Sequence, residues 1–158
     1  MTNDNLSQLW DDITPKLYGY LINTLRDRDL AGDILQNTWL KAIEALPNFK
    51  GGDKEFSSWL FTIARNECRQ YWRKGGREIS FDPEVHDVED VDSGIEDKIM
   101  VDQVLSRLSE SDRELMQLRY ISGLPLDNIA KILKINPVAV RVRMHRAKNA
   151  LKATLKNI

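Results

Sequence analysis

Residues 124–151 read LPLDNIAKILKINPVAVRVRMHRAKNAL, and this stretch decides how the rest of the chain is interpreted. Its first half has apolar residues at helical spacing, and the small Ala130 allows a crossing helix to approach closely. Ile135 is expected to fill a tight turn. Asn136 can cap the next helix with its side-chain oxygen, and Pro137 suits the first helical position, where its missing N–H costs nothing. The pattern predicts a helix-turn-helix.

The second helix of this motif is strongly basic. After Asp127 the chain carries eight lysines and arginines and no acidic residue. The apolar stripe expected to hold the helix on its own domain consists of Val140, Met144, Ala147, Leu151 and Leu155. The basic face beside it consists of Arg141, His145, Lys148 and Lys152, flanked by Arg143 and Arg146. A solvated helix end is the plainer interpretation, since cations suit a helix C-terminus. The turn, the cap and the charge together favour a recognition helix in the major groove of DNA.

Charge is distributed unevenly along the 158 residues. Residues 1–75 carry ten basic and ten acidic side chains, residues 76–98 carry two and nine, and residues 99–158 carry eleven and five. The acidic middle opposes the electrostatic term that drives binding to DNA. We therefore expect the chain to bind DNA weakly alone and to need a partner.

Several classes of protein are not expected. The single cysteine, Cys68, rules out an intramolecular disulfide and a cysteine-based zinc cluster, and His86 has no second metal-ligating partner pattern around it. No set of His, Cys or carboxylate residues has the spacing of a nucleophile, a general base or a metal site, so we expect no enzyme, no catalytic residue, no metal and no cofactor. No signal peptide or long apolar run is present, which predicts a cytoplasmic protein without membrane insertion.

Two helices are predicted in residues 10–46. The first has apolar residues at Trp10, Ile13, Leu17, Leu21 and Leu25, and Thr14 with Pro15 is expected to restart or kink it. The second is expected to be capped by Asp29 and to end before Pro47. Its buried face is predicted to consist of Ala31, Ile34, Leu35, Thr38, Ala42, Ala45 and Leu46. The face opposite, which either meets solvent or docks a partner helix, consists of Asp33, Gln36, Asn37, Leu40 and Lys41.

A glycine-containing loop at residues 47–55 precedes a third helix. Its core stripe is predicted to consist of Phe56, Leu60, Ile63, Ala64 and Tyr71. Its outer surface is predicted to hold Trp59, Arg65, Asn66, Arg69, Trp72, Arg73 and Lys74. Arginines interleaved with aromatic residues are typical of proteins that bind single-stranded nucleic acid, but aromatics at helical spacing more often belong to a core. Both interpretations remain open from spacing alone.

The remaining helices belong to the C-terminal part. Ile99, Val104, Leu105 and Leu108 suggest one helix. Ser111 has capping-box spacing with Glu114 and is expected to open another, with Leu115, Leu118 and Ile121 inward and Gly123 as its C-terminal stop. The chain is thus predicted to be all-α, with two small helical domains, 1–75 and 99–158, joined by an acidic flexible linker, 76–98, and with the helix-turn-helix in the second domain.

Nearly the whole chain resembles the extracytoplasmic-function (ECF) sigma factors. Residues 33–42, DILQNTWLKA, are similar to the helix with which this family docks on a coiled coil of the β′ subunit of RNA polymerase. Residues 56–66, FSSWLFTIARN, resemble its promoter-melting helix, and the loop 48–55 lies where the family captures a flipped-out base of the minus-ten element. Residues 140–147, VRVRMHRA, resemble its reader of the minus-thirty-five element.

The resemblance implies two sets of binding residues. Polymerase would be bound by Asp33, Gln36, Asn37, Leu40 and Lys41. DNA would be bound by Asn48, Phe49, Lys50, Trp59, Arg65, Asn66, Arg69, Arg141, Val142, His145, Arg146 and Lys148. The implied partners are core RNA polymerase through β′ and β, promoter DNA as duplex and as melted non-template strand, and an anti-sigma factor, which the absence of a fused C-terminal extension favours as a separate protein. The acidic linker would occupy the active-site and RNA-exit channel.

Two positions depart from the family pattern, and two other functions compete. Asn37 replaces a usual acidic residue, and Val142 replaces a common small polar one.

A ligand-sensing helix-turn-helix regulator would bind duplex tightly without being a polymerase subunit. A helical interaction protein of another class would leave the basic C-terminus as a solvated face. We predict a promoter-recognition subunit that directs transcription initiation and helps to open the duplex.

Overall fold

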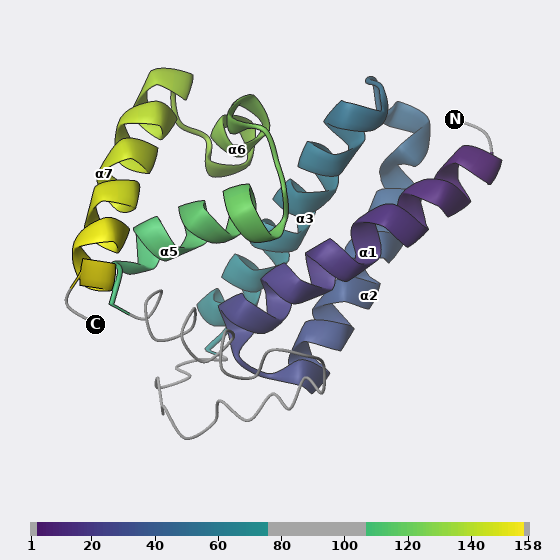
Figure 1. Cartoon of the computed structure of the whole chain (residues 1–158). Helices are drawn as coiled ribbons and strands as arrows, with labels where there is room; N and C mark the ends of the chain where they lie inside the picture. Colours follow the sequence, from purple (N-terminus) through teal and green to yellow (C-terminus); the bar gives the residue numbers. More distant parts are fainter. Residues whose placement is uncertain (1–2, 76–106, 157–158) are drawn as a thin grey trace. The chain divides into compact units, whose positions relative to one another are not determined.

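The computed structural model of the chain describes residues 3–75 and 107–156 (Figure 1). The chain divides into two compact units. The first contains α1 (Asn3–Leu25), α2 (Arg28–Ala45), the short 3₁₀ helix η1 (Leu46–Asn48) and α3 (Asp53–Arg73). The second contains α5 (Glu110–Met116), the π-helix η3 (Gln117–Ile121), most of α6 (Leu126–Leu133) and α7 (Pro137–Lys156). Within the two described ranges no strand occurs, and the all-α prediction is confirmed.

Some of the predictions concern residues outside the two described ranges and are not compared with the structure. The acidic linker, His86, and Ile99, Val104 and Leu105 of the expected C-terminal helix lie outside the described residues. Among the helices that the structure describes, none combines the length and the apolar character needed to cross a membrane.

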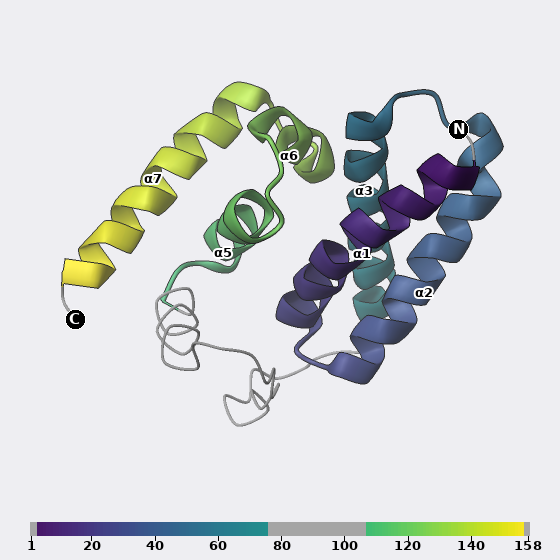
Figure 2. The same cartoon turned by 45° about the vertical axis from the view of Figure 1, so that its right-hand side comes forward.

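The first unit is a three-helix bundle in which α1, α2 and α3 lie side by side (Figure 2). Four of the five predicted core positions of α1 are buried, and the fifth, Trp10, is exposed. The buried face of α2 consists of Ala31, Ile34, Thr38, Trp39 and Ala42. The buried face of α3 consists of Phe56, Ser58, Leu60, Phe61, Ala64, Glu67 and Cys68, whereas the predicted core residues Ile63 and Tyr71 are half-buried.

Two details of α1 and α2 differ from the predictions. The helix α1 continues through Pro15 from Asn3 to Leu25, so the predicted restart does not occur. Asp27 caps α2 in place of Asp29, because its extended backbone brings the side-chain oxygen 3.1 Å from the N–H of Leu30. Asp29 lies in the first turn, where its charge still suits the positive end of the helix.

Trp39 is the main core residue that the sequence pattern missed. Its side chain is 2% exposed, and its indole N–H donates a hydrogen bond to the hydroxyl of Thr14 at 3.1 Å. The exposed Trp10 lies against it, with ring centroids 4.5 Å apart. Trp39 therefore joins α2 to α1 through both apolar contact and a satisfied polar atom.

The second unit begins with a cap two residues earlier than predicted. The hydroxyl of Ser109 accepts a hydrogen bond from the N–H of Asp112 at 3.2 Å, so Ser109 rather than Ser111 starts α5. Leu115 and Leu118 are buried as predicted, and Gly123 ends the segment with φ of 70°.

Ile121 was predicted to point inward, but its side chain is 45% exposed. The cause is η3, in which the N–H of Ser122 donates to the carbonyl of Gln117 at 2.9 Å, a spacing of five residues. One extra residue in the turn changes the rotation of the side chains that follow it. The prediction assumed a continuous α-helix and therefore placed Ile121 on the wrong face.

The helix-turn-helix forms as expected from the local sequence. Asn136 accepts a hydrogen bond from the N–H of Val138 at 2.8 Å, and Pro137 is the first residue of α7. Lys134 takes the turn with φ of 58°. The stripe of α7 is buried at Val140, Met144 and Ala147, half-buried at Leu151 and exposed at Leu155. Including Leu155 was wrong, because the last turn of α7 extends past the buried part of its stripe.

Candidate nucleic-acid and partner interfaces

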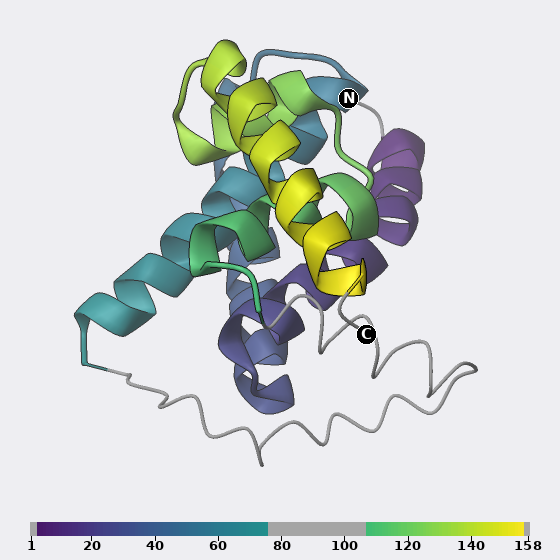
Figure 3. The same ribbon diagram turned by 60° about the vertical axis from the view of Figure 1, so that its left-hand side comes forward.

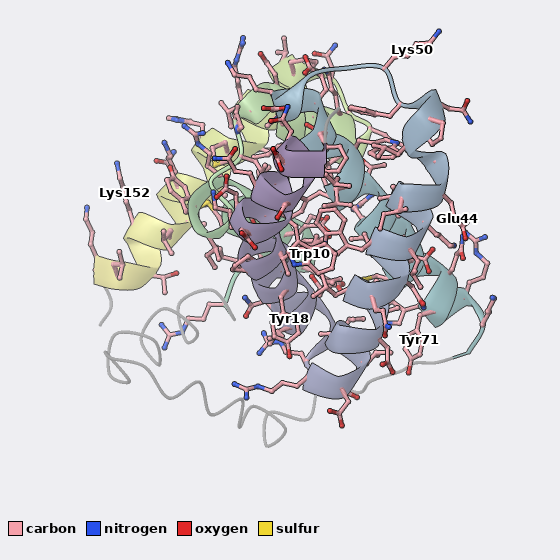
Figure 4. All side chains as sticks on the ribbon, turned by 90° about the vertical axis from the view of Figure 1, so that its right-hand side faces the viewer. Trp10, Tyr18, Glu44, Lys50, Tyr71 and Lys152 are labelled. Atoms are coloured by element: carbon pink, nitrogen blue, oxygen red, sulfur yellow. The ribbon has the colours of Figure 1, made fainter. Side chains whose placement is uncertain are left out.

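The predicted partner face of α2 is a continuous exposed surface. At about 100° per residue, its members fall on one side of the helix. All of them are exposed: Asp33, Gln36, Asn37, Leu40 and Lys41. Leu40 is 53% exposed and the neighbouring Ile43, which the sequence analysis did not single out, is 50% exposed. Glu44 follows on the same side (Figure 4). The face therefore combines apolar area with polar groups at its edges.

Lys41 also has a partner inside the first unit. Its ammonium forms an ion pair with the carboxylate of Glu67 on α3. The Glu67 side chain is 10% exposed and that of Lys41 is 50% exposed. A carboxylate this far from water needs a compensating charge. Lys41 thus connects the partner face of α2 to α3, a role that the spacing of the two residues in the sequence does not reveal.

The loop between α2 and α3 is closed by hydrogen bonds that two of its backbone amides donate. The N–H of Phe49 donates to the carbonyl of Leu46, and the N–H of Gly52 donates to Oε2 of Glu55, each at 3.0 Å. Hydrogen bonds from the backbone amides of Glu55 and Gly52 lower the pKa of the Glu55 carboxyl from its ordinary value of 4.5. A Cβ atom at Gly51 would lie 2.9 Å from Cβ of Glu55, so the loop closes this tightly only with glycine there.

Closure of the loop brings Phe49 onto α3. Its ring lies 4.7 Å from the ring of Trp59, with planes 30° apart, and 5.6 Å from the ring of Phe56. Phe49 and Trp59 are both half-buried. Asn48 is exposed, and Lys50 projects from the loop (Figure 4). The structure therefore brings these four predicted DNA-binding residues together, with one face of the tryptophan already covered by phenylalanine.

The other predicted residues of α3 continue around the helix from Trp59. Asn66 and Arg69 are exposed and lie on the outer side that Trp59 also borders. Arg65 is half-buried and lies about 120° around the helix from Trp59. Trp59, Asn66 and Arg69 thus share one side of α3, and Arg65, four residues before Arg69, lies beside Arg69 at the half-buried edge of that side.

The basic face lies along α7, the long helix of the second unit (Figure 3). Arg141, Val142, His145 and Arg146 are all exposed and fall within an arc of about 140°. Lys148 is exposed at the border of this arc, with its ammonium 5.7 Å from the centre of the Tyr120 ring. The buried stripe fixes the rotation of α7, so these side chains face away from the core together.

Comparisons with known proteins agree with this arrangement. Residues 9–78 match the family model for sigma-70 region 2, and residues 98–151 match a model for sigma-70 region 4. The RNA polymerase sigma-H factor of Pseudomonas aeruginosa is 30% identical over 156 residues, covering 89% of this chain and 80% of that protein. The ECF RNA polymerase sigma factor SigM of Bacillus subtilis is 26% identical, covering 97% and 94%.

A solved structure agrees over the same length. The sigma factor RpoE of Bartonella quintana, in complex with the anti-sigma factor NepR, superposes with a TM-score of 0.72 and 29% identity over 96% of this chain and 97% of that one. The family is identified by the two matched regions, which follow each other in the same order, and by the sigma-H factor, which is 30% identical over 80% of its length. The chain belongs to the sigma-70 family of RNA polymerase sigma factors, in its extracytoplasmic-function group.

Proposed function

We propose that this sigma factor binds core RNA polymerase through the first unit, reads the minus-thirty-five element through α7 and opens the minus-ten element through the loop before α3. The match to both sigma-70 regions carries the function as a whole. A ligand-sensing helix-turn-helix regulator is not favoured, because the N-terminal part matches region 2 rather than a sensor domain.

Polymerase docking is assigned to the exposed face of α2. Leu40 and Ile43 provide apolar area, and Asp33, Gln36 and Asn37 provide polar groups beside it. The β′ subunit is the partner that the family resemblance implies, with β as a further contact. Lys41 serves this face indirectly, since its ammonium is paired with Glu67.

Opening of the duplex is assigned to the loop and the outer face of α3. Asn48 and Lys50 are exposed beside the stacked rings of Phe49 and Trp59. A base leaving the duplex gains stacking on aromatic rings, and cations nearby contact its phosphate. Asn66 and Arg69 extend this surface along α3 toward the non-template strand.

Duplex reading is assigned to Arg141, Val142, His145 and Arg146, with Lys148 at their edge. A bidentate contact from an arginine to a guanine contributes about 1–3 kcal/mol of discrimination against other bases. We further propose that the chain has an anti-sigma partner, as the similar RpoE does in its complex with NepR, and that residues 1–75 and 99–158 act as separate domains on either side of the linker.

The test is run-off transcription with core RNA polymerase and a pool of genomic fragments, with and without the protein. Discrete new transcripts that disappear with the double variant Arg141→Ala, Arg146→Ala support promoter selection by α7. The matched control is Lys16→Ala, Lys156→Ala, which removes the same charge from exposed positions outside the proposed binding residues and should keep the transcripts. The absence of new transcripts, combined with tight binding to duplex without polymerase, would overturn the proposal.

A further inference from the structure

Tyr120 is an exposed aromatic residue to which the proposed function gives no role. Its side chain is 54% exposed, and it lies in the π turn between α5 and Gly123. The same turn buries Gln117 and Leu118 and leaves Tyr120 and Ile121 at the surface. The ring of Tyr120 therefore lies at the surface of the second unit, on the side of the π turn away from its buried residues.

The ring meets a cation of α7. The ammonium of Lys148 lies 5.7 Å from the centroid of Tyr120, within the distance at which a cation is attracted to an aromatic face. An exposed lysine has many rotamers, and part of this freedom is lost when the ammonium contacts a ligand. A ring that already holds the ammonium reduces this loss.

The position of Lys148 on α7 indicates what it contacts. At about 100° per residue it lies about 90° from the middle of the arc formed by Arg141, Val142, His145 and Arg146, on the side that borders the buried stripe. If the arc of Arg141, Val142, His145 and Arg146 is directed at the base edges, the side chain of Lys148, rotated by about 90° from it, faces the wall of the major groove. Phosphates form this wall, and lysine binds them as a point charge.

We propose that Tyr120 is a positioning residue, whose ring holds the Lys148 ammonium against a phosphate of the promoter duplex at the edge of the surface read by α7. This inference rests on the proposed function of α7. It assigns Lys148 to backbone contact rather than base readout, so its contribution is the same for every promoter sequence.

The experiment measures binding of the holoenzyme, formed from the full chain and core polymerase, to duplex containing the minus-thirty-five element at several salt concentrations. Lys148→Gln should weaken binding and reduce the slope of log K against log salt by about 0.9, the value for one phosphate contact. Tyr120→Leu should weaken binding by about two- to fivefold, the range of an exposed cation–π contact. The double variant should bind no more weakly than Lys148→Gln alone.

Conservative variants separate positioning from folding. Tyr120→Phe keeps the ring and should bind as the wild type does, and Ile121→Ala, in the same π turn, should also leave binding unchanged. Equal losses from Tyr120→Phe and Tyr120→Leu, or additive losses in the double variant, would overturn the inference. If Lys148→Gln binds as tightly as the wild type while the Arg141→Ala, Arg146→Ala double variant binds more weakly, this inference alone is overturned. If neither variant loses affinity for the duplex, the proposed role of α7 is overturned as well.

Discussion

The ion pair between Lys41 and Glu67 gives a sharp test of how the first unit is held together. Lys41→Met removes the ammonium and leaves the Glu67 carboxylate, 10% exposed, without its counter-charge. Loss of one partner from a fully buried pair costs about 3–5 kcal/mol, whereas an exposed pair contributes about 0–1 kcal/mol. Since Lys41 is half exposed and water reaches that side of the pair, we expect a loss of about 1–3 kcal/mol in the free energy of unfolding.

The opposite variant should behave differently. Glu67→Met removes the charge that is costly to bury, and Lys41 can return its ammonium to water. We expect a change within about 1 kcal/mol for Glu67→Met, and near wild-type stability for the double variant, because replacing both partners by apolar groups removes the desolvation cost.

Urea unfolding followed by tryptophan fluorescence measures the first unit selectively, because all four tryptophans, Trp10, Trp39, Trp59 and Trp72, belong to α1, α2 and α3. A loss below about 0.5 kcal/mol for Lys41→Met, or a coupling energy below that value in the double-mutant cycle, would refute the reasoning. The stable double variant then tests docking: unchanged affinity for core polymerase shows that the charge of Lys41 serves the fold rather than the interface.

Three further perturbations test local features. Glu55→Gln should lower the thermal midpoint of the first unit at neutral pH. The folded pKa of Glu55 lies below 4.5, so the stability that its carboxylate contributes is present above pH 4.5 and is lost as the pH falls through the folded pKa. The wild type and Glu55→Gln should therefore have the same thermal midpoint in acid. A difference in midpoint that persists in acid, or one no larger than that of the control Glu44→Gln, contradicts the reasoning. Gly51→Ala should reduce opening of the minus-ten element, measured by permanganate reactivity of its thymines, because the new Cβ would lie 2.9 Å from Cβ of Glu55 and 3.1 Å from the ring of Phe49, which the closed loop holds in place. Unchanged reactivity would contradict this reasoning. Asn136→Ala should cost the second unit about 0.5–2 kcal/mol, measured by circular dichroism, because the N–H of Val138 loses its acceptor, and a loss below about 0.3 kcal/mol argues against the cap.

Much of the helix-turn-helix follows from local chemistry. The cap at Asn136 depends on a side-chain oxygen, and Pro137 fits the first turn because it lacks an N–H. Just before the motif, Gly123 ends the preceding segment through its positive φ. The stripe through Val140 and Met144 depends only on helical periodicity. The exposure of the predicted residues of α2 and α7 was likewise predictable, because a stripe that is buried leaves the opposite face in water.

Predictions failed where two local choices were nearly equal. Asp27 and Asp29 are both suitable caps, as are Ser109 and Ser111, and only the path of the preceding chain decides which oxygen reaches an amide. Periodicity also assumes a regular helix, so the π turn before Gly123 reversed the prediction for Ile121.

The all-α class, the position of the basic helix and the family could be predicted from the sequence, because they depend on residue types at fixed separations along the chain. Four contacts became visible only in the folded chain: Trp39 is buried against α1, Lys41 pairs with Glu67, Phe49 covers Trp59, and Lys148 lies over Tyr120. Each of these contacts joins residues on different elements. Their distances depend on how the helices pack and on the turns between them, which no periodicity within one helix encodes.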